Sequence, residues 1–207
     1  MGDTTRLVQQ VHDHGYCILE EVIPSDRVGG VCADVLGVDP AHNRADAPSN
    51  RGAVSGLINH TQSFAPYLAD PRLRPLTRAL LGEHVRVSFT STIISLPGAR
   101  RLKWHGDWPF NQDNAGHIPA PYPDMVAHLT SIWMLTDFTE DNGATGIVPL
   151  SHRSKAKSPP PDLDVDGELV KTVTGSAGSL IMWHGGAYHM ARANTGDSVR
   201  VGLNVAY

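Results

Sequence analysis

The spacing of apolar residues changes its character near residue 84. Before this point, hydrophobic side chains recur at helical intervals, behind polar capping residues and ahead of glycine, which predicts amphipathic helices. After it, short runs of β-branched and aromatic residues alternate with turns that contain Gly, Asn or Pro, which predicts antiparallel strands. We therefore expect a helical N-terminal part over residues 1–83 and a β core over residues 84–207.

Within the N-terminal part, three segments have helical periodicity and one is typical of a strand. The predicted helices cover residues 4–14, 25–37 and 71–82, and the predicted strand covers residues 16–19. Residues 38–63 are rich in Asp, Pro, Asn and Gly and have no periodic apolar pattern, so we expect a surface loop there.

The β core begins with its longest β-branched run, residues 85–94, ahead of the turn Pro97-Gly98. Asp141-Asn142-Gly143 is typical of a hairpin turn. Further strands are predicted at residues 102–105, 125–135, 144–149, 169–173, 179–183 and 199–205. Helices followed by antiparallel strands favour a mainly β fold with flanking helices, namely a double-stranded β-helix of the jelly-roll or cupin-like type.

Length and charge narrow the range of functions. At 207 residues, with 41% hydrophobic and 18% charged residues, the chain is long enough for one complete core, so we expect a single domain over residues 1–207. A formal net charge of −4 provides no basic field for a polyanion, and nucleic acid is not an expected partner. No uninterrupted apolar run of about 18 residues is present, so we expect no membrane partner.

Cys17 and Cys32 fall on a predicted strand and a predicted helix. We interpret both as small core residues with free thiols, which are common in reducing compartments. The N-terminus also lacks an apolar segment followed by a cleavage site. These features favour a cytoplasmic protein.

His105-Gly106-Asp107 has the chemistry of half a metal site. Side chains two residues apart in an extended segment point to the same face, so His105 and Asp107 can ligate one ion. Two histidines and one carboxylate with open positions are typical of non-haem Fe(II) oxygenases. With 11 histidines and 21 acidic residues in the chain, the spacing is a weak signal by itself. The second histidine could be His184 or His189, and the spacing does not decide between them.

Three motifs, taken in order, resemble the phytanoyl-CoA dioxygenase family. They are Trp104 to Trp108, Leu135 to Thr145 with Pro149 to His152, and the segment ending at Arg200. The resemblance implies a jelly-roll enzyme that uses Fe(II), 2-oxoglutarate and O₂. In that family an asparagine and an arginine follow the distal ligand histidine by five and eleven residues. Counted from His189 these offsets fall on Asn194 and Arg200, whereas from His184 they fall on His189 and Thr195.

The resemblance thus implies His105, Asp107 and His189 as the metal ligands and as the catalytic centre. It implies Arg200 as the cosubstrate-binding residue, a suitable one because a guanidinium donates two parallel hydrogen bonds to a carboxylate. We interpret His184 as structural or supporting. Because relatives that halogenate replace the ligand carboxylate by a small residue, Asp107 favours hydroxylation. Two departures from the family pattern are Leu150, where a glycine is usual, and Ala191, where some members carry a hydroxyl.

Several further residues are weaker candidates. Trp108 and Phe110 follow the carboxylate and are predicted to wall the substrate cavity. Thr130 and Trp133 are possible residues of the cosubstrate pocket, although core packing is the simpler interpretation for each. His117 and His128 have no partner at a telling offset, and we interpret them as surface or hydrogen-bonded polar residues.

The functional hypothesis is an Fe(II)- and 2-oxoglutarate-dependent dioxygenase that hydroxylates or otherwise oxidises a small-molecule substrate, in the manner of family members from secondary metabolism. One alternative is a jelly-roll protein that binds a small molecule without turnover, since a fold does not determine function. Another is a cupin-type oxygenase that does not use 2-oxoglutarate. The sequence predicts neither the substrate nor the oligomeric state.

Overall fold

The structure is a computed structural model, and it describes residues 2–38, 50–108, 119, 121, 123, 125–154, 159–160, 163–164 and 167–207. Its helices are α1 (Asp3–His14), α2 (Ser25–Leu36) and α3 (Leu73–Leu81), with short 3₁₀ segments η2 (Leu57–Asn59), η3 (Ala65–Ala69) and η4 (Ser151–Ser154). Its strands are β1 (Tyr16–Leu19), β2 (Arg51–Gly52), β3 (Phe89–Ser95), β4 (Leu129–Met134), β5 (Thr145–Ile147), β6 (Lys171–Val173), β7 (Leu180–His184), β8 (His189–Ala191) and β9 (Arg200–Ala206).

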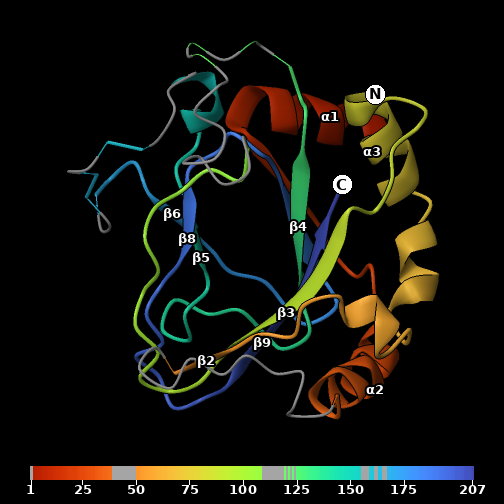
Figure 1. Cartoon of the computed structure of the whole chain (residues 1–207), viewed down its shortest axis with the longest axis vertical. Coiled ribbons are helices and arrows are strands. Elements are labelled where there is room, and N and C mark those ends of the chain that lie inside the picture. The colour runs from red at the N-terminus through yellow and green to blue at the C-terminus, as the bar shows by residue number, and fades with distance from the viewer. Residues whose placement is uncertain are drawn as a thin grey trace.

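The described strands form two antiparallel sheets that face each other. The major sheet has six strands in the order β1-β7-β4-β9-β3-β2, and the minor sheet has three in the order β6-β5-β8. Figure 1 shows the minor sheet on the left of the major sheet and the helices α2 and α3 on its right, with α1 along the top. This arrangement is the predicted jelly roll with helices packed outside it.

The three helices confirm the predicted periodicity to within two residues at each end. Helix α1 shows why apolar spacing and a following glycine predicted its bounds correctly. Its buried residues Leu7 and Val11 are one turn apart, and Gly15 ends the helix in the left-handed conformation with its N–H donating to the Val11 carbonyl. Glycine adopts this conformation without the strain that a side chain would cause.

Two hydrophobic clusters cover opposite faces of the major sheet. The first lies under the helices and includes Leu180 and Met182 of β7, and the second lies between the two sheets and includes Ile181 and Trp183 of the same strand. Because successive side chains of a strand point to opposite faces, β7 is buried on both sides, which explains its continuous apolar run.

The structure differs from the sequence prediction chiefly in four places, and several of the other strands are shorter than predicted. Only His105 of residues 102–105 makes a bridge, and β8 and β2 occur where no strand was predicted. Two- and three-residue strands are too short for a periodic pattern to reveal them. The turn at 141–143 does not close a hairpin, because β4 belongs to the major sheet and β5 to the minor sheet.

Strands β1 and β2 extend the major sheet with residues from the N-terminal part, so this part is not purely helical. The single domain over residues 1–207 stays a prediction. Among the described helices, none has the length and apolar character needed to cross a bilayer.

Candidate metal centre

His105 and His189 face each other in a short antiparallel bridge at the edge of the minor sheet. The N–H of His105 donates to the carbonyl of His189 over 3.1 Å, and the N–H of His189 donates back over 2.9 Å. Two residues further on, the N–H groups of Asp107 and Trp108 both donate to the Gly185 carbonyl, over 2.7 and 2.9 Å. Backbone hydrogen bonds therefore fix the main-chain positions of all three proposed ligands.

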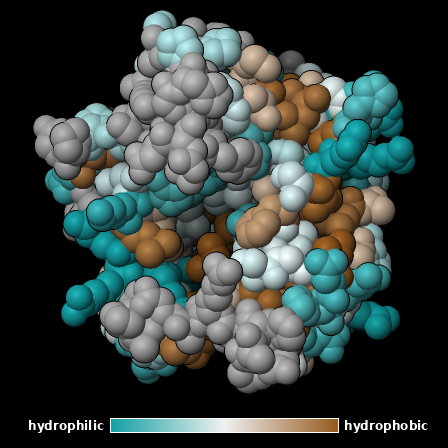
Figure 2. Space-filling view, in the orientation of Figure 1, coloured by the Kyte–Doolittle hydropathy of each residue, from teal (hydrophilic) through white to brown (hydrophobic). Residues whose placement is uncertain are grey.

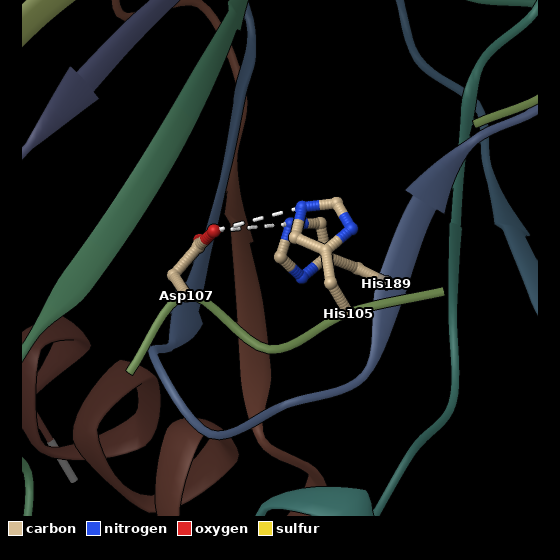
Figure 3. A group of neighbouring side chains, drawn as sticks. All are labelled: His105, Asp107 and His189. Atoms are coloured by element: carbon tan, nitrogen blue, oxygen red, sulfur yellow. Dashed lines mark ion pairs between the residues drawn. The ribbon is translucent and has the colours of Figure 1, made fainter. Parts of the chain in front are cut away.

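The three side chains converge on one point. His105 Nε2 lies 3.8 Å and His189 Nε2 lies 3.5 Å from Asp107 Oδ1. Figure 3 shows both imidazole rings turned toward the carboxylate, His189 from β8 and the other two residues from the neighbouring segment. One ligand atom from each residue lies within 4.8 Å of the others, and within the described residues no other group of three His, Cys, Asp or Glu side chains meets this criterion.

Hydrogen bonds at the far side of each ring determine which nitrogen faces the centre. Nδ1 of His105 lies 2.9 Å from the Lys103 carbonyl, and Nδ1 of His189 lies 3.0 Å from the Ala187 carbonyl. A carbonyl only accepts, so both Nδ1 atoms carry hydrogen and both Nε2 atoms present a lone pair. In metal sites, such a hydrogen bond from the other ring nitrogen to a carbonyl orients the histidine ligand.

The protonation states also suit a cation. Burial alone would raise the pKa of the Asp107 carboxyl, but the neighbouring His189 and the hydrogen bond from Thr130 outweigh it, so its pKa lies below the ordinary value. Burial holds the pKa of His189 below its ordinary value. A carboxylate and a neutral imidazole are the forms that bind metal.

Exposure differs among the three side chains and shows where the centre opens. The His105 side chain is 45% exposed, that of Asp107 19% and that of His189 8%. The centre is therefore reached from the side of His105, and His189 forms its floor.

A cavity of about 100 Å³ extends from this centre between the two sheets. Its lining includes the three proposed ligands, the apolar side chains of Ile93, Leu102, Ile132, Trp183, Met190 and Ala191, and the polar side chains of Thr130, Thr145, Arg200 and Asn204. The space between the sheets opens as a hollow near the centre of the face in Figure 2.

Arg200 provides a buried cation at the inner end of this cavity. The residue is 1% exposed, and its Nε and Nη2 have no hydrogen-bond partner among the described residues. Burial, and secondarily the nearby Arg51, lowers the pKa of Arg200 to about 9, so the guanidinium stays charged at neutral pH. A buried charge without a partner is costly, and an anionic ligand would satisfy it.

Arg51 is a buried cation that the sequence analysis missed. It occupies β2 and flanks Ser95 of β3 on one side, while Arg200 of β9 flanks Ser95 on the other. Its guanidinium donates to the carbonyls of Arg100 and Arg192. A lone arginine in a polar stretch carries no signal of burial, because the register that places it beside Arg200 comes from strands distant in sequence.

The structure separates the two histidine candidates. His184 ends β7 with its ring 5.3 Å from that of His152, and its Nδ1 accepts a hydrogen bond from Gly186 N–H, so it lies apart from the group around Asp107. Asn194, whose offset favoured His189, is structural, since its amide donates to the carbonyls of Ser95 and Ser198.

The weaker candidates have mixed outcomes. Thr130 lines the cavity, whereas Trp133 is fully buried in the cluster under the helices. His128 is buried and hydrogen-bonded to Thr130, so the surface interpretation of this residue is wrong and the hydrogen-bonded one is right. Trp108 is half-buried and is not among the described residues that line the cavity. Phe110 and His117 lie outside the described residues.

Comparison with protein-family models identifies the chain. Residues 11–202 match the family described as phytanoyl-CoA dioxygenase (PhyH). The match covers most of the chain, so the chain belongs to the phytanoyl-CoA dioxygenase family, as its motifs predicted.

Curated relatives include dioxygenases from fungi and bacteria. Dioxygenase af480 of Aspergillus fumigatus is 30% identical over 140 residues, which are 68% of this chain and 42% of that protein. Ectoine dioxygenase of Bordetella bronchiseptica is 26% identical over 233 residues, 97% of this chain and 73% of that protein. The chain thus spans less than half the length of the first relative and about three-quarters of the second.

Solved structures share the fold. The α-ketoglutarate-dependent carbocyclase SnoK from nogalamycin biosynthesis superposes with a TM-score of 0.75 at 20% identity, over 100% of this chain and 83% of that one. HygX from Streptomyces hygroscopicus, with nickel, 2-oxoglutarate and hygromycin B bound, superposes with a TM-score of 0.76 at 14% identity, over 97% and 85%. The predicted jelly-roll fold is confirmed, and the predicted class of enzyme and cosubstrate agrees with the family and with these neighbours.

Proposed function

We propose that this protein is an Fe(II)- and 2-oxoglutarate-dependent dioxygenase that oxidises a small molecule. His105, Asp107 and His189 would hold the metal, and Arg200 would bind the far carboxylate of 2-oxoglutarate. Bound iron supplies the activation of O₂, coupled to oxidation of 2-oxoglutarate to succinate and CO₂. One oxygen atom of O₂ enters succinate and the other is available to hydroxylate a C–H bond.

One observation carries the proposal: two lone-pair nitrogens and a carboxylate oxygen converge beside a buried guanidinium, two of whose nitrogens have no hydrogen-bond partner among the described residues. Within 4.8 Å the chain offers a two-histidine, one-carboxylate set, which leaves part of the metal's coordination sphere open. The same cavity contains Arg200, whose Nε and Nη2 lack partners among the described residues. A dicarboxylate of suitable length would bind the metal at one end and pair with the Arg200 guanidinium at the other.

The chain's own residues contribute orientation and exclusion of water. Arg200 would fix the cosubstrate by its carboxylate, while the apolar walls at Ile93, Ile132 and Met190 limit the water around the reacting atoms. Trp108, next to Asp107, remains a proposed wall of the substrate cavity.

A small-molecule substrate is supported by two structural neighbours, HygX with hygromycin B bound and EctD from S. alaskensis with 2-oxoglutarate and 5-hydroxyectoine. Hydroxylation is favoured over halogenation because the carboxylate of Asp107 takes a coordination position that a halide would need. The proposed location is the cytoplasm, supported by two free cysteines, of which Cys17 is buried. The absence of a nucleic-acid partner stays a prediction.

The proposal is tested by loading the purified protein anaerobically with Fe(II), adding 2-oxoglutarate and air, and measuring succinate. We expect succinate to form slowly without substrate and faster when a screened small molecule is accepted. His105→Ala and Asp107→Ala should form no more succinate than metal-free protein. The proposal is contradicted if the wild-type protein forms no more succinate than these variants with every compound screened.

Arg200→Ala separates one alternative from the proposal, and O₂ consumption separates the other. An oxygenase that does not use 2-oxoglutarate keeps its activity in this variant, whereas the proposed enzyme loses cosubstrate binding. A protein that binds without turnover would bind Fe(II) and 2-oxoglutarate tightly but consume no O₂ with any compound. Calorimetric titration of 2-oxoglutarate and an oxygen electrode distinguish these outcomes.

A further inference from the structure

Two buried donors hold the outer oxygen of the Asp107 carboxylate. The Thr130 hydroxyl donates to Asp107 Oδ2 over 2.6 Å, and the Trp183 indole N–H donates to the same oxygen over 3.0 Å. Thr130 and Trp183 are 4% and 2% exposed. They are direct cross-strand partners in the register of β4 and β7, so one rung of the major sheet presents both donors.

His128 lies against the Thr130 hydroxyl, and both residues are buried. A hydroxyl has one hydrogen, and that of Thr130 is used by Asp107. The His128 Nε2 lies 2.9 Å from the same hydroxyl oxygen. His128 is 2% exposed, and a Cβ at Gly185 would come within 3.0 Å of its side chain. Tight packing thus keeps His128 in place.

The two oxygens of Asp107 consequently have different surroundings. Oδ2 accepts two hydrogen bonds from the sheet, whereas Oδ1 faces the Nε2 atoms of His105 and His189 at 3.8 and 3.5 Å. A carboxylate that is free to turn can bind a divalent cation through both oxygens. Turning Asp107 toward that mode would break two buried hydrogen bonds, each to a charged group.

We propose that Thr130 and Trp183 are positioning residues that keep Asp107 a ligand through one oxygen only. Three single-atom ligands on a six-coordinate metal leave about three coordination positions open. These are enough for a bidentate 2-oxo acid and O₂ together. A carboxylate bound through both oxygens would leave about two, so that 2-oxoglutarate would occupy the place of O₂. The inference rests on the proposed function, because it assigns these residues a role at the same metal site.

Counting the exchangeable waters on bound Mn(II) tests the inference without any substrate. Mn(II) is added alone, and the water-proton relaxation rate per bound ion is measured before and after 2-oxoglutarate. We expect about three waters in the wild type and about two in the double variant T130V/W183F, a loss of about one third. After addition of 2-oxoglutarate, we expect about one water in the wild type and none in the double variant.

Matched variants distinguish positioning from a general loss of structure. Thr130→Ser retains the donating hydroxyl and should keep the wild-type water count. Thr77→Val also removes a buried hydroxyl, one that donates to the Arg74 carbonyl in α3 away from the metal site, and should keep it too. The single variants Thr130→Val and Trp183→Phe each remove one donor and should give intermediate counts if the double variant does not fold.

A purely structural role would lower the melting temperature or weaken Mn(II) binding without changing the waters per bound ion. An unchanged count in folded T130V/W183F, or in both single variants, therefore overturns the inference while the proposed function stands. Failure of wild-type protein to bind Mn(II), or binding that His105→Ala leaves intact, overturns both.

Discussion

The guanidinium carbon of Arg200 lies 4.7 Å from the centroid of the Phe138 ring. Phe138 is buried between the two sheets, four residues after the end of β4. Gly202 allows this contact, since a Cβ there would come within 3.3 Å of both Arg200 Nη1 and Phe138 Cζ. The ring face partly offsets the buried positive charge and limits how the guanidinium can tilt.

Replacing this ring should weaken cosubstrate binding. Phe138→Leu keeps an apolar side chain but removes the π face, and we expect the Kd for 2-oxoglutarate to rise by about 3- to 30-fold, from a cation–π contribution of about 0.5–2 kcal/mol. Isothermal titration of metal-loaded protein measures this. Phe64→Leu, in the cluster under the helices, should lower stability without changing the Kd. Equal weakening in the two variants would show that loss of packing, and not the ring contact, is responsible.

We expect the buried charge of Arg200 to lower the free energy of unfolding when 2-oxoglutarate is not bound. Its guanidinium is buried and only partly hydrogen-bonded among the described residues. Arg200→Met has a similar length and no charge, so we expect the free energy of unfolding to rise by about 1–4 kcal/mol. Urea unfolding measures this. 2-Oxoglutarate should raise the melting temperature of metal-loaded wild type but not of the variant. A variant less stable than the wild type would mean that Arg200 is a structural residue.

Leu150 has a backbone conformation that suits glycine or asparagine. Its φ is 68°, in the left-handed region, at the position where the family usually has glycine. The side chain is 51% exposed, so little packing is lost on replacement. Because left-handed backbone costs an ordinary residue about 1–2 kcal/mol and asparagine less, Leu150→Asn should raise the free energy of unfolding by about 1 kcal/mol.

Leu169→Asn is the matched control for Leu150→Asn. Leu169 is 73% exposed and is not among the described residues with positive φ. We expect its replacement to change the free energy of unfolding by no more than about 0.5 kcal/mol. If the free energy of unfolding rises equally in both variants, the stabilisation comes from removing exposed apolar surface and not from relief of backbone strain.

The pairing of Asp70 with Arg72 should make stability depend on pH in the acid range. Arg72 Nε and Nη2 donate to the Asp70 carboxylate over 3.1 and 2.9 Å, and Nη1 donates to the Glu20 carbonyl. Burial raises the pKa of Asp70, but the hydrogen bonds from Arg72 outweigh it, so the pKa in the folded protein lies below the ordinary value. The unfolded chain therefore takes up the proton first as the pH falls.

The contribution of this pair is present above the unfolded pKa of about 4 and is lost as the pH falls through the lower, folded pKa. Asp70→Asn should accordingly lower the free energy of unfolding by about 1 kcal/mol at pH 7. The difference from wild type should shrink between about pH 5 and pH 3. Urea titrations across this range measure it, and a difference that does not change with pH would contradict the assignment.

The sequence predicted those parts of the fold that depend on local periodicity. The helices around Leu7, Val31 and Leu76 were predicted nearly to their ends, because one turn of apolar spacing determines which face is buried. Strand β8 was missed because its three residues show no alternation, and the turn at Asn142 was assigned to the wrong pairing. Asn142 instead bonds within its own turn and bridges to Asn194, which a local pattern cannot reveal.

At the site, too, the sequence revealed local spacing but not contacts between distant residues. The spacing of His105 and Asp107 was visible in the sequence, and the family's offsets distinguished His189 from His184. Thr130, Trp183 and Arg51 carry no such mark. Each reaches the site through cross-strand register, which brings together residues more than 40 positions apart and depends on the whole sheet.

The backbone bridge between His105 and His189, with the paired bonds to Gly185, has an evolutionary consequence. The proposed ligands are anchored by hydrogen bonds among residues 103–108 and 185–189. The positions of the proposed ligands therefore depend on these few hydrogen bonds and not on the other side chains of the cavity. Side chains that line the cavity can then change under selection while the three proposed ligands keep their places.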